Sequence, residues 1–194
     1  MTLYQAESEL WQDFRNGSEK AFASIYEAYF TRLYNYGHQF CRDGEIIKDC
    51  LQNLFIDLRR NCRNLGEVGS LRNYLYAALR YRIVQELRSP QYRSAALSDQ
   101  YSFQLVIPYE DYLVARQFSA EQKDSIERAL RQLTRRQREV IFLRFYENLS
   151  YQEVASVMGL EDVKSARNLV SKAVCSLRQH LTYPALHVLL WLWQ

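Results

Sequence analysis

Apolar side chains recur every three or four positions through most of the N-terminal half of the chain. This spacing puts them on one face of an α-helix. The pattern predicts helices over about residues 18–41, 45–61 and 71–88. Ser70 is a good N-cap for the third helix, which is expected to end before Ser89-Pro90, because proline disfavours a helical conformation in the preceding residue. Residues 61–70, which include two glycines, are expected to form a loop.

Capping patterns mark where helices begin in the C-terminal half. In a capping box, a Ser or Thr and a Glu or Gln three positions later bond each other's backbone N–H groups. Boxes open at Ser119, Thr134 and Ser150. Asp162 is expected to cap a last helix, over about 163–181, and the apolar face of that helix comprises Ala166, Leu169, Val170, Ala173, Val174, Leu177 and Leu181. The chain is therefore predicted to be all-α.

These elements predict two small helical domains joined by a linker. The first domain covers residues 1–90, the linker 91–118 and the second domain 119–181. The linker region carries prolines, serines and mixed charge, which leaves open a short helix near 110–117 and a strand at 103–107.

The last residues, 182–194, form an apolar tail. Its apolar run is about half the roughly twenty residues that a membrane-spanning helix needs. Docking on the body, docking on a partner and a weak membrane-surface contact all stay open for it. The other end of the chain is polar, with Glu7, Glu9 and Asp13, and does not resemble a signal peptide. A cytoplasmic location is therefore expected.

Gly159 lies where one short helix must turn sharply into the next. A glycine can adopt the left-handed conformation there without steric cost. Ala155, four residues earlier, is small enough for the two helices to pack closely. The wedge between the helices is expected to be filled by Val154, Met158 and Leu160. This spacing is typical of a helix-turn-helix.

The turn after Gly159 is expected to be one residue longer than usual. The usual spacing would put the polar Ser165 and Asn168 in the core, whereas Ala166 and Leu169 follow each of them by one residue. In the longer register, the face opposite the core carries Lys164, Arg167, Asn168, Ser171 and Lys172. Arg and Lys suit guanine edges and phosphates, and Asn suits adenine. These residues are predicted to contact DNA, and the alternative is an ordinary solvated face.

Further cations precede the helix-turn-helix. Phosphate contacts are the expected role of Arg135, Arg136, Arg138 and Arg144.

The charges are unevenly distributed, although the net charge is only +3. Residues 58–93 carry eight Arg against two Glu, and residues 125–181 carry ten basic against six acidic groups. Two basic segments fit two contact surfaces on one polyanion, although solvated helix faces explain the charge equally well. The first segment also carries Tyr74, Tyr76, Tyr81 and Tyr92. Rings beside cations hold single-stranded DNA, but any single Tyr is more often a core residue.

Composition excludes several other classes of protein. Hydrophobic residues make up 48% and charged residues 24%, as in globular proteins rather than disordered or collagen-like ones. The cysteines, Cys41, Cys50, Cys62 and Cys175, form no CxxC pair, and His38 with Cys41 is a lone HxxC. Free thiols are expected, with no metal site. No nucleophile–base pair or phosphate-binding loop is present, so no catalytic residue, cofactor or enzymatic activity is predicted.

Two stretches resemble a known family. The run Asp49-Cys-Leu-Gln52-Asn-Leu-Phe55, followed by Leu71-Arg-Asn-Tyr-Leu-Tyr-Ala-Ala-Leu-Arg80, resembles region two of bacterial sigma factors. The stretch from Leu133 to Ala155 resembles region four. The chain therefore resembles an extracytoplasmic-function sigma factor of the sigma-70 family, over about residues 20–90 and 120–181. Such a protein binds core RNA polymerase, reads the minus-ten and minus-thirty-five promoter elements and helps to open the duplex.

The resemblance implies a role for each matched segment. In the family, one helix of region two docks on the β′ clamp of the polymerase. The residues that match this helix are Asp49, Gln52 and Phe55, although Phe55 suits a core position equally well. The loop that captures a flipped base, and the helix that touches the melting duplex, match Asn61, Arg63, Asn64, Arg72, Asn73, Arg80 and Tyr81. The family usually has Asn at the position of Tyr81 and Asp at that of Gln85.

Region four of the family recognises the minus-thirty-five element and also contacts the β flap, and the C-terminal domain of this chain is expected to do the same. The family further implies an anti-sigma protein as a partner, often a membrane-anchored one. The alternative function is a stand-alone helix-turn-helix regulator that binds duplex DNA as a dimer. The docking pattern at 49–55 and the Arg/Tyr segment argue against it.

Overall fold

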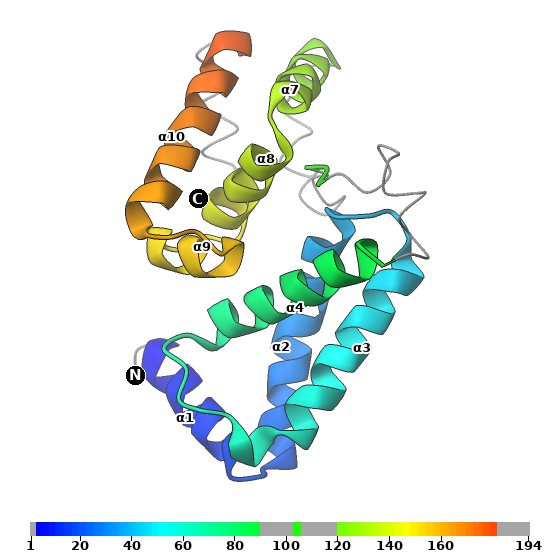
Figure 1. Ribbon diagram of the computed structural model, residues 1–194, viewed down its shortest axis with the longest axis vertical. Coiled ribbons are helices and arrows are strands. Elements are labelled where there is room, and N and C mark those ends of the chain that lie inside the picture. Colours follow the sequence, from blue (N-terminus) through cyan, green and yellow to red (C-terminus); the bar gives the residue numbers. More distant parts are fainter. Residues whose placement is uncertain (1–2, 90–102, 106–119, 182–194) are drawn as a thin grey trace. The chain divides into compact units, whose positions relative to one another are not determined.

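The fold of the chain is all-α, as predicted (Figure 1). The computed structural model describes residues 3–89, 103–105 and 120–181, and every regular element within those ranges is a helix. Contacts divide the chain into two compact units, Met1–Tyr101 and Ser102–Gln194. The division falls inside the predicted linker, 91–118.

Unit 1 contains the helices α1 (Leu3–Arg15), α2 (Glu19–His38), α3 (Gly44–Arg60) and α4 (Leu71–Leu87), with a short 3₁₀ helix, η1 (Cys62–Asn64). The predicted helices correspond to α2, α3 and α4. Each begins at a polar N-cap, and the caps are Ser18, Asp43 and Ser70. Their side-chain oxygens accept bonds from backbone N–H groups of the first helical turn, which would otherwise lack partners.

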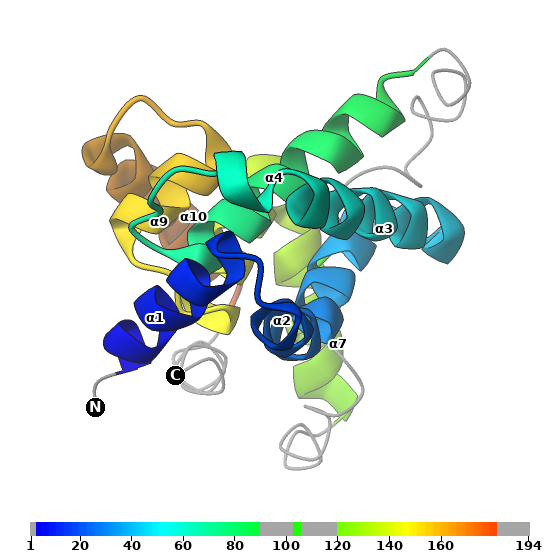
Figure 2. The same ribbon diagram turned by 90° about the horizontal axis from the view of Figure 1, so that it is seen from below.

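Helix α1 is the element that the apolar pattern did not predict. It packs on α2, η1 and α4 (Figure 2). Trp11 and Phe14 are buried, and the indole N–H of Trp11 donates a hydrogen bond to the carbonyl oxygen of Gly66 at 3.1 Å. The hydroxyl of Tyr29 donates to Oε1 of Glu7 at 2.6 Å. These partners are distant in the chain, so α1 is held by tertiary contacts rather than by a long apolar stripe.

The core of unit 1 lies where α2, α3 and α4 meet. Its fully buried side chains include Leu33, Tyr36, Ile47, Leu51, Leu75, Tyr76 and Leu79. Gly37 of α2 lies against Ile47 of α3, and an added Cβ would be 2.5 Å from Cγ2 of Ile47. A glycine is therefore needed for α2 and α3 to approach this closely.

Unit 2 contains α7 (Ala120–Gln132), α8 (Arg135–Ile141), a π-helical turn η4 (Phe142–Tyr146), α9 (Tyr151–Met158) and α10 (Val163–His180). The capping boxes at Thr134 and Ser150 are confirmed, each with both reciprocal bonds. Helix α8 is followed directly by η4, where the N–H of Glu147 bonds the carbonyl of Phe142 five residues back. Asn148 then takes a left-handed conformation, with φ +54°.

Residues 103–105 have no regular structure, so the described part of the strand suggested at 103–107 is not a strand. Phe103 is instead fully buried, with its ring centroid 6.0 Å from that of Phe142. Several predictions lie outside the described residues. These are the rest of that segment, the short helix near 110–117, the box at Ser119, Tyr92 and the tail 182–194. Among the helices that are described, none is long and apolar enough to cross a membrane.

Candidate nucleic-acid interface

The turn between α9 and α10 has the geometry expected of a helix-turn-helix. Gly159 has φ +60° and ψ +46°, the left-handed conformation. Its N–H bonds the carbonyl of Ser156, and the N–H of Leu160 bonds the carbonyl of Ala155 at 2.8 Å. This bond pair is a Schellman motif, which satisfies carbonyls at the end of α9 and turns the chain.

The burial pattern of α10 agrees with the longer turn predicted from the sequence. Of the two core positions of that register, Ala166 is fully buried and Leu169 is half-buried, with Val170 beside it nearly fully buried. Ser165 is half-buried and Asn168 is exposed. Helix α10 begins after Asp162, which is its N-cap as predicted. The core positions therefore follow the register that starts at Ala166.

The side chains predicted to contact DNA on α10 are all exposed. They are Lys164, Arg167, Asn168, Ser171 and Lys172. The first turn of this helix is held by Asp162, whose Oδ1 accepts from the N–H of Ser165 at 2.6 Å. This backbone bond lowers the pKa of the Asp162 carboxyl. The carboxylate is therefore charged at neutral pH and caps a helix whose start carries the positive end of the helix dipole.

The four arginines ahead of the turn differ in their surroundings. Arg135 and Arg136 of α8 are exposed, and Arg138 is half-buried. Arg144 of η4 is also half-buried, and its Nη1 donates to the carbonyl of Leu149 at 3.3 Å. The guanidinium of Arg144 is therefore held by the turn that leads into α9.

In unit 1, the residues predicted to meet the minus-ten element lie on η1 and α4. Asn61, Arg63 and Asn64 are exposed around η1. Further along the chain, three of the set are half-buried on α4, namely Arg72, Asn73 and Arg80. Tyr81 is 69% exposed, the largest value among the exposed large apolar side chains of the described residues. Exposed polar side chains at η1 and an exposed ring on α4 thus belong to the same unit.

The tyrosines interleaved with arginine separate into different environments. Tyr76 is fully buried in the core. Tyr74 is half-buried, its ring centroid lies 5.7 Å from that of Trp11, and burial raises its pKa. Of the tyrosines in this segment that the structure describes, Tyr81 is the one that presents its ring to solvent.

The basic segment of unit 1 is partly neutralised within the fold. Arg82 pairs with Asp57 at 2.8 Å, and Arg59 pairs with Glu19 at 3.0 Å. Counting charges between residues 58 and 93 therefore overstates the cationic surface. Both carboxylates lie outside that range, so the sum over the segment could not include them.

The three residues matched to polymerase docking do not share one environment. Asp49 and Gln52 are exposed on α3. Phe55 is 4% exposed, with its ring centroid 4.9 Å from Tyr26 and 6.3 Å from Phe22. Of the two readings of Phe55, the structure shows the core position. Of the three, Asp49 and Gln52 are the ones whose side chains are exposed.

All four cysteines are free thiols. Cys41 and Cys50 are buried, and burial raises the pKa of each thiol to about 11. They are therefore protonated and unreactive at neutral pH. In the part of the chain that the structure describes, no three His, Cys, Asp or Glu side chains gather where they could hold a metal ion.

Two family models match the chain, one within each unit, and each match includes the candidate nucleic-acid-binding residues of that unit. Residues 25–93 match the model for sigma-70 region 2. Residues 123–174 match the model for sigma-70 region 4. The chain belongs to the sigma-70 family. Unit 1 thus contains region 2, and unit 2 contains the helix-turn-helix of region 4.

Relatives of this sigma factor agree with that assignment. It is 28% identical over 149 residues to the ECF RNA polymerase sigma factor SigK of Mycolicibacterium vanbaalenii, covering 75% of this chain and 76% of that protein. A solved structure of CnrH in complex with the cytosolic domain of CnrY matches with a TM-score of 0.59 at 19% identity. The match covers 90% of this chain and 96% of CnrH, and it shows the shared fold.

The sequence did not reveal how region 4 of this sigma factor holds its arginines. Tyr151, the first residue of α9, lies under two guanidinium groups from other elements. The capping box drew attention to Ser150 and Glu153 but gave no role to the residue beside the cap. An aromatic residue next to a cap, with arginines seven residues before and sixteen after it, was the available signal.

Proposed function

We propose that this sigma factor binds core RNA polymerase through α3 and directs initiation at promoters that carry two separate elements. Region 2 engages the minus-ten element and assists opening, and region 4 reads the minus-thirty-five duplex. The observation that carries the proposal is the face of α10. Its polar and basic side chains are exposed, while its apolar positions are buried behind a helix-turn-helix.

Region 4 supports duplex recognition by its shape and charge. A helix that follows a sharp turn can enter the major groove, where its first turns reach base edges. Lys164, Arg167 and Asn168 occupy those turns. Lys172 lies further along the same face and suits a phosphate.

Region 2 supports contact with unpaired bases. Tyr81 offers an exposed ring, and stacking on a ring stabilises a base by about 1–3 kcal/mol. Asn61, Arg63 and Asn64 around η1 offer exposed donors near the loop that leads to α4. Capturing one base there offsets part of the unstacking cost of a few kcal/mol.

The docking surface on α3 is carried by Asp49 and Gln52, which are exposed one helical turn apart. Phe55 supports them from the core rather than by touching the partner. The β′ clamp is the partner proposed for this surface, and the β flap is proposed for region 4. The work of such a factor takes place in the cytoplasm.

An anti-sigma protein is proposed as a further partner. The structural neighbour CnrH is solved with the cytosolic domain of another protein, CnrY, bound to it. The shared fold makes a comparable complex feasible for this chain. A membrane anchor on that partner is part of the proposal taken from the family.

Transcription with purified core polymerase tests the function. The full chain is added to core enzyme and a pool of genomic fragments, and the 5′ ends of transcripts are sequenced. Start sites that need the chain and share two spaced elements are the expected result. A stand-alone dimeric regulator would bind DNA but create no start site, and that outcome would overturn the proposal. Asp49→Ala/Gln52→Ala should lose core binding, whereas Asn53→Ala, at the exposed position that follows Gln52, should keep it.

A further inference from the structure

Two arginines of unit 2 lie over the same aromatic ring. The guanidinium carbon of Arg144 is 5.1 Å from the ring centroid of Tyr151, and that of Arg167 is 5.6 Å from it. The three residues come from η4, α9 and α10. Both distances are within the range of a cation–π contact.

Arg144 is held by more than the ring. Its Nη1 donates to the carbonyl of Leu149 at 3.3 Å and reaches Oδ1 of Asn148 at 3.5 Å. Its guanidinium also lies 5.9 Å from the ring centroid of Phe145. The left-handed conformation of Asn148 belongs to the turn that makes these bonds. Arg144 is therefore oriented before any ligand arrives.

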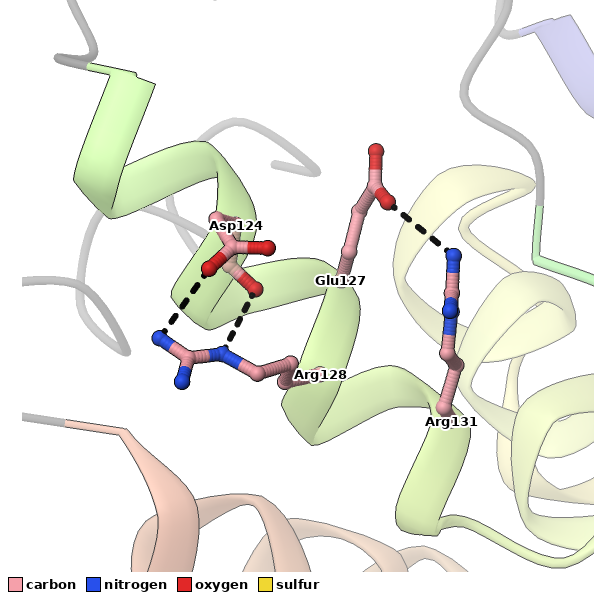
Figure 3. A network of polar contacts seen from close by, with 4 residues as sticks. All are labelled: Asp124, Glu127, Arg128 and Arg131. Atoms are coloured by element: carbon pink, nitrogen blue, oxygen red, sulfur yellow. Dashed lines mark hydrogen bonds and ion pairs between the residues drawn. The ribbon is translucent and has the colours of Figure 1, made fainter.

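Neither Arg144 nor Arg167 is in an ion pair among the residues that the structure describes. Arginines of α7 in the same unit provide the contrast (Figure 3). Arg128 pairs with Asp124 at 3.2 Å, and Arg131 pairs with Glu127 at 3.5 Å. Arg128 and Arg131 are thus each paired with a carboxylate of their own helix. The guanidinium groups of Arg144 and Arg167 lie 5.1 and 5.6 Å from the centroid of the same ring, and neither pairs with a carboxylate of the described residues. Both therefore keep an uncompensated positive charge that attracts an anion.

We propose that Tyr151 is a positioning residue that holds Arg144 and Arg167 together as a clamp for the DNA phosphate backbone. Arg167 then contacts phosphate rather than a base edge, and the reading of bases falls to Asn168 and Ser171. The assignment rests on the proposed function, because it concerns how region 4 grips its duplex. It changes the role first expected of Arg167 on the recognition face.

Phosphate and base contacts have different signatures. A phosphate contact strengthens binding to every sequence and releases counterions, so each contact adds about 0.9 to the slope of log K against log salt for duplex DNA. A base contact changes discrimination between sequences and leaves that slope nearly unchanged. The two roles of Arg167 can therefore be separated by titration.

The experiment uses holoenzyme assembled from core polymerase and the full chain. Binding is measured across a series of salt concentrations. The probes are a duplex with the minus-thirty-five element of a promoter mapped by transcript sequencing, and a duplex in which that element is scrambled. Arg167→Ala should lower the salt slope by about one and weaken binding to both duplexes by the same factor. Asn168→Ala should instead keep the slope and reduce the preference for the promoter duplex.

Tyr151 variants test the positioning role. Tyr151→Phe keeps the ring and should behave as the parent chain, whereas Tyr151→Leu keeps apolar bulk without a π face and should lower the slope as Arg167→Ala does. Arg128→Ala removes one cation from α7 and is the matched control, with an unchanged slope. Circular dichroism of each variant checks the fold. Should Tyr151→Leu unfold unit 2, Arg144→Lys takes its place, because lysine keeps the charge but not the planar stacking.

Two results would overturn the clamp. One is an Arg167→Ala variant with an unchanged slope and relaxed sequence preference, which would make Arg167 a base reader. The other is Tyr151→Leu with the parent slope, which would show that the ring orients neither cation. If Arg144→Lys takes its place, the parent slope would remove Arg144 from the clamp. A parent holoenzyme that fails to form, or that binds both duplexes equally, would count against the proposed function instead.

Discussion

Replacing Gly37 by alanine should destabilise unit 1, although alanine is the better helix former. The new Cβ would lie 2.5 Å from Cγ2 of Ile47 and 3.4 Å from Cδ1 of Ile83. Non-bonded carbons prefer about 3.5–4.0 Å, so the Ile47 methyl must move by about 1 Å. Ile47 and Ile83 are fully buried, and a β-branched side chain in a helix has one strongly preferred rotamer. The methyl therefore cannot swing aside without moving the backbone.

Two opposing effects set the magnitude. Overpacking a core costs about 1–3 kcal/mol. Removing a glycine from a helix interior returns about 0.5–1 kcal/mol. The net loss is about 1–2 kcal/mol, which corresponds to about 5–15 °C in the melting temperature of a domain of this size. Thermal unfolding gives the total, and hydrogen exchange of peptides from α2 and α3 assigns the loss to unit 1.

A matched glycine provides the control. Gly66 has no atom within 4 Å of an added Cβ and no left-handed backbone. Gly66→Ala should therefore leave stability unchanged or raise it by up to about 1 kcal/mol, because alanine lowers the conformational entropy of the unfolded chain. If Gly37→Ala proves as stable as Gly66→Ala, the close approach of α2 and α3 does not depend on glycine. The double variant Gly37→Ala/Ile47→Ala no longer has the clash. Its loss of stability should therefore be smaller than the sum of the losses of the two single variants.

Three further predictions concern the functional surfaces. Gly159→Ala should cost about 1–2 kcal/mol in thermal unfolding, from the left-handed backbone alone, because its Cβ meets open space. The pKa of Asp162 is lowered, so its stabilising cap is present above the ordinary carboxyl pKa and is lost as pH falls through the lowered value. Asp162→Asn keeps a cap without a charge, so the advantage of Asp over Asn should shrink on acidification, and a constant difference would contradict this. Tyr81→Ala should reduce promoter opening, read as permanganate reactivity of thymines, by the equivalent of about 1–3 kcal/mol, while Tyr81→Phe should not.

Local features of unit 2 could be predicted from the sequence because they depend on residues a few positions apart. The boxes at Thr134 and Ser150, the left-handed Gly159 and the cap at Asp162 each involve one turn of chain. The register of α10 followed from the same short range, since it depends on which of two adjacent residues is apolar.

The candidate site was predicted less completely. The exposure of the α10 face followed from helix periodicity. The burial of Phe55 did not, since its spacing from Asp49 and Gln52 is compatible with either face at the edge of the core. Its place was decided by the rings of Phe22 and Tyr26, which come from another helix.

The sequence by itself determined where most helices begin, how the helix-turn-helix turns and which side of α10 faces outward. Tertiary structure alone decided that α1 exists as a packed helix, that Asp57 and Glu19 neutralise two arginines of the basic segment, and that Tyr151 gathers Arg144 and Arg167. Each of these depends on groups that lie between 7 and 55 positions apart in the chain. Periodicity and capping act within about one helical turn, so only the packing of whole helices brings such partners together.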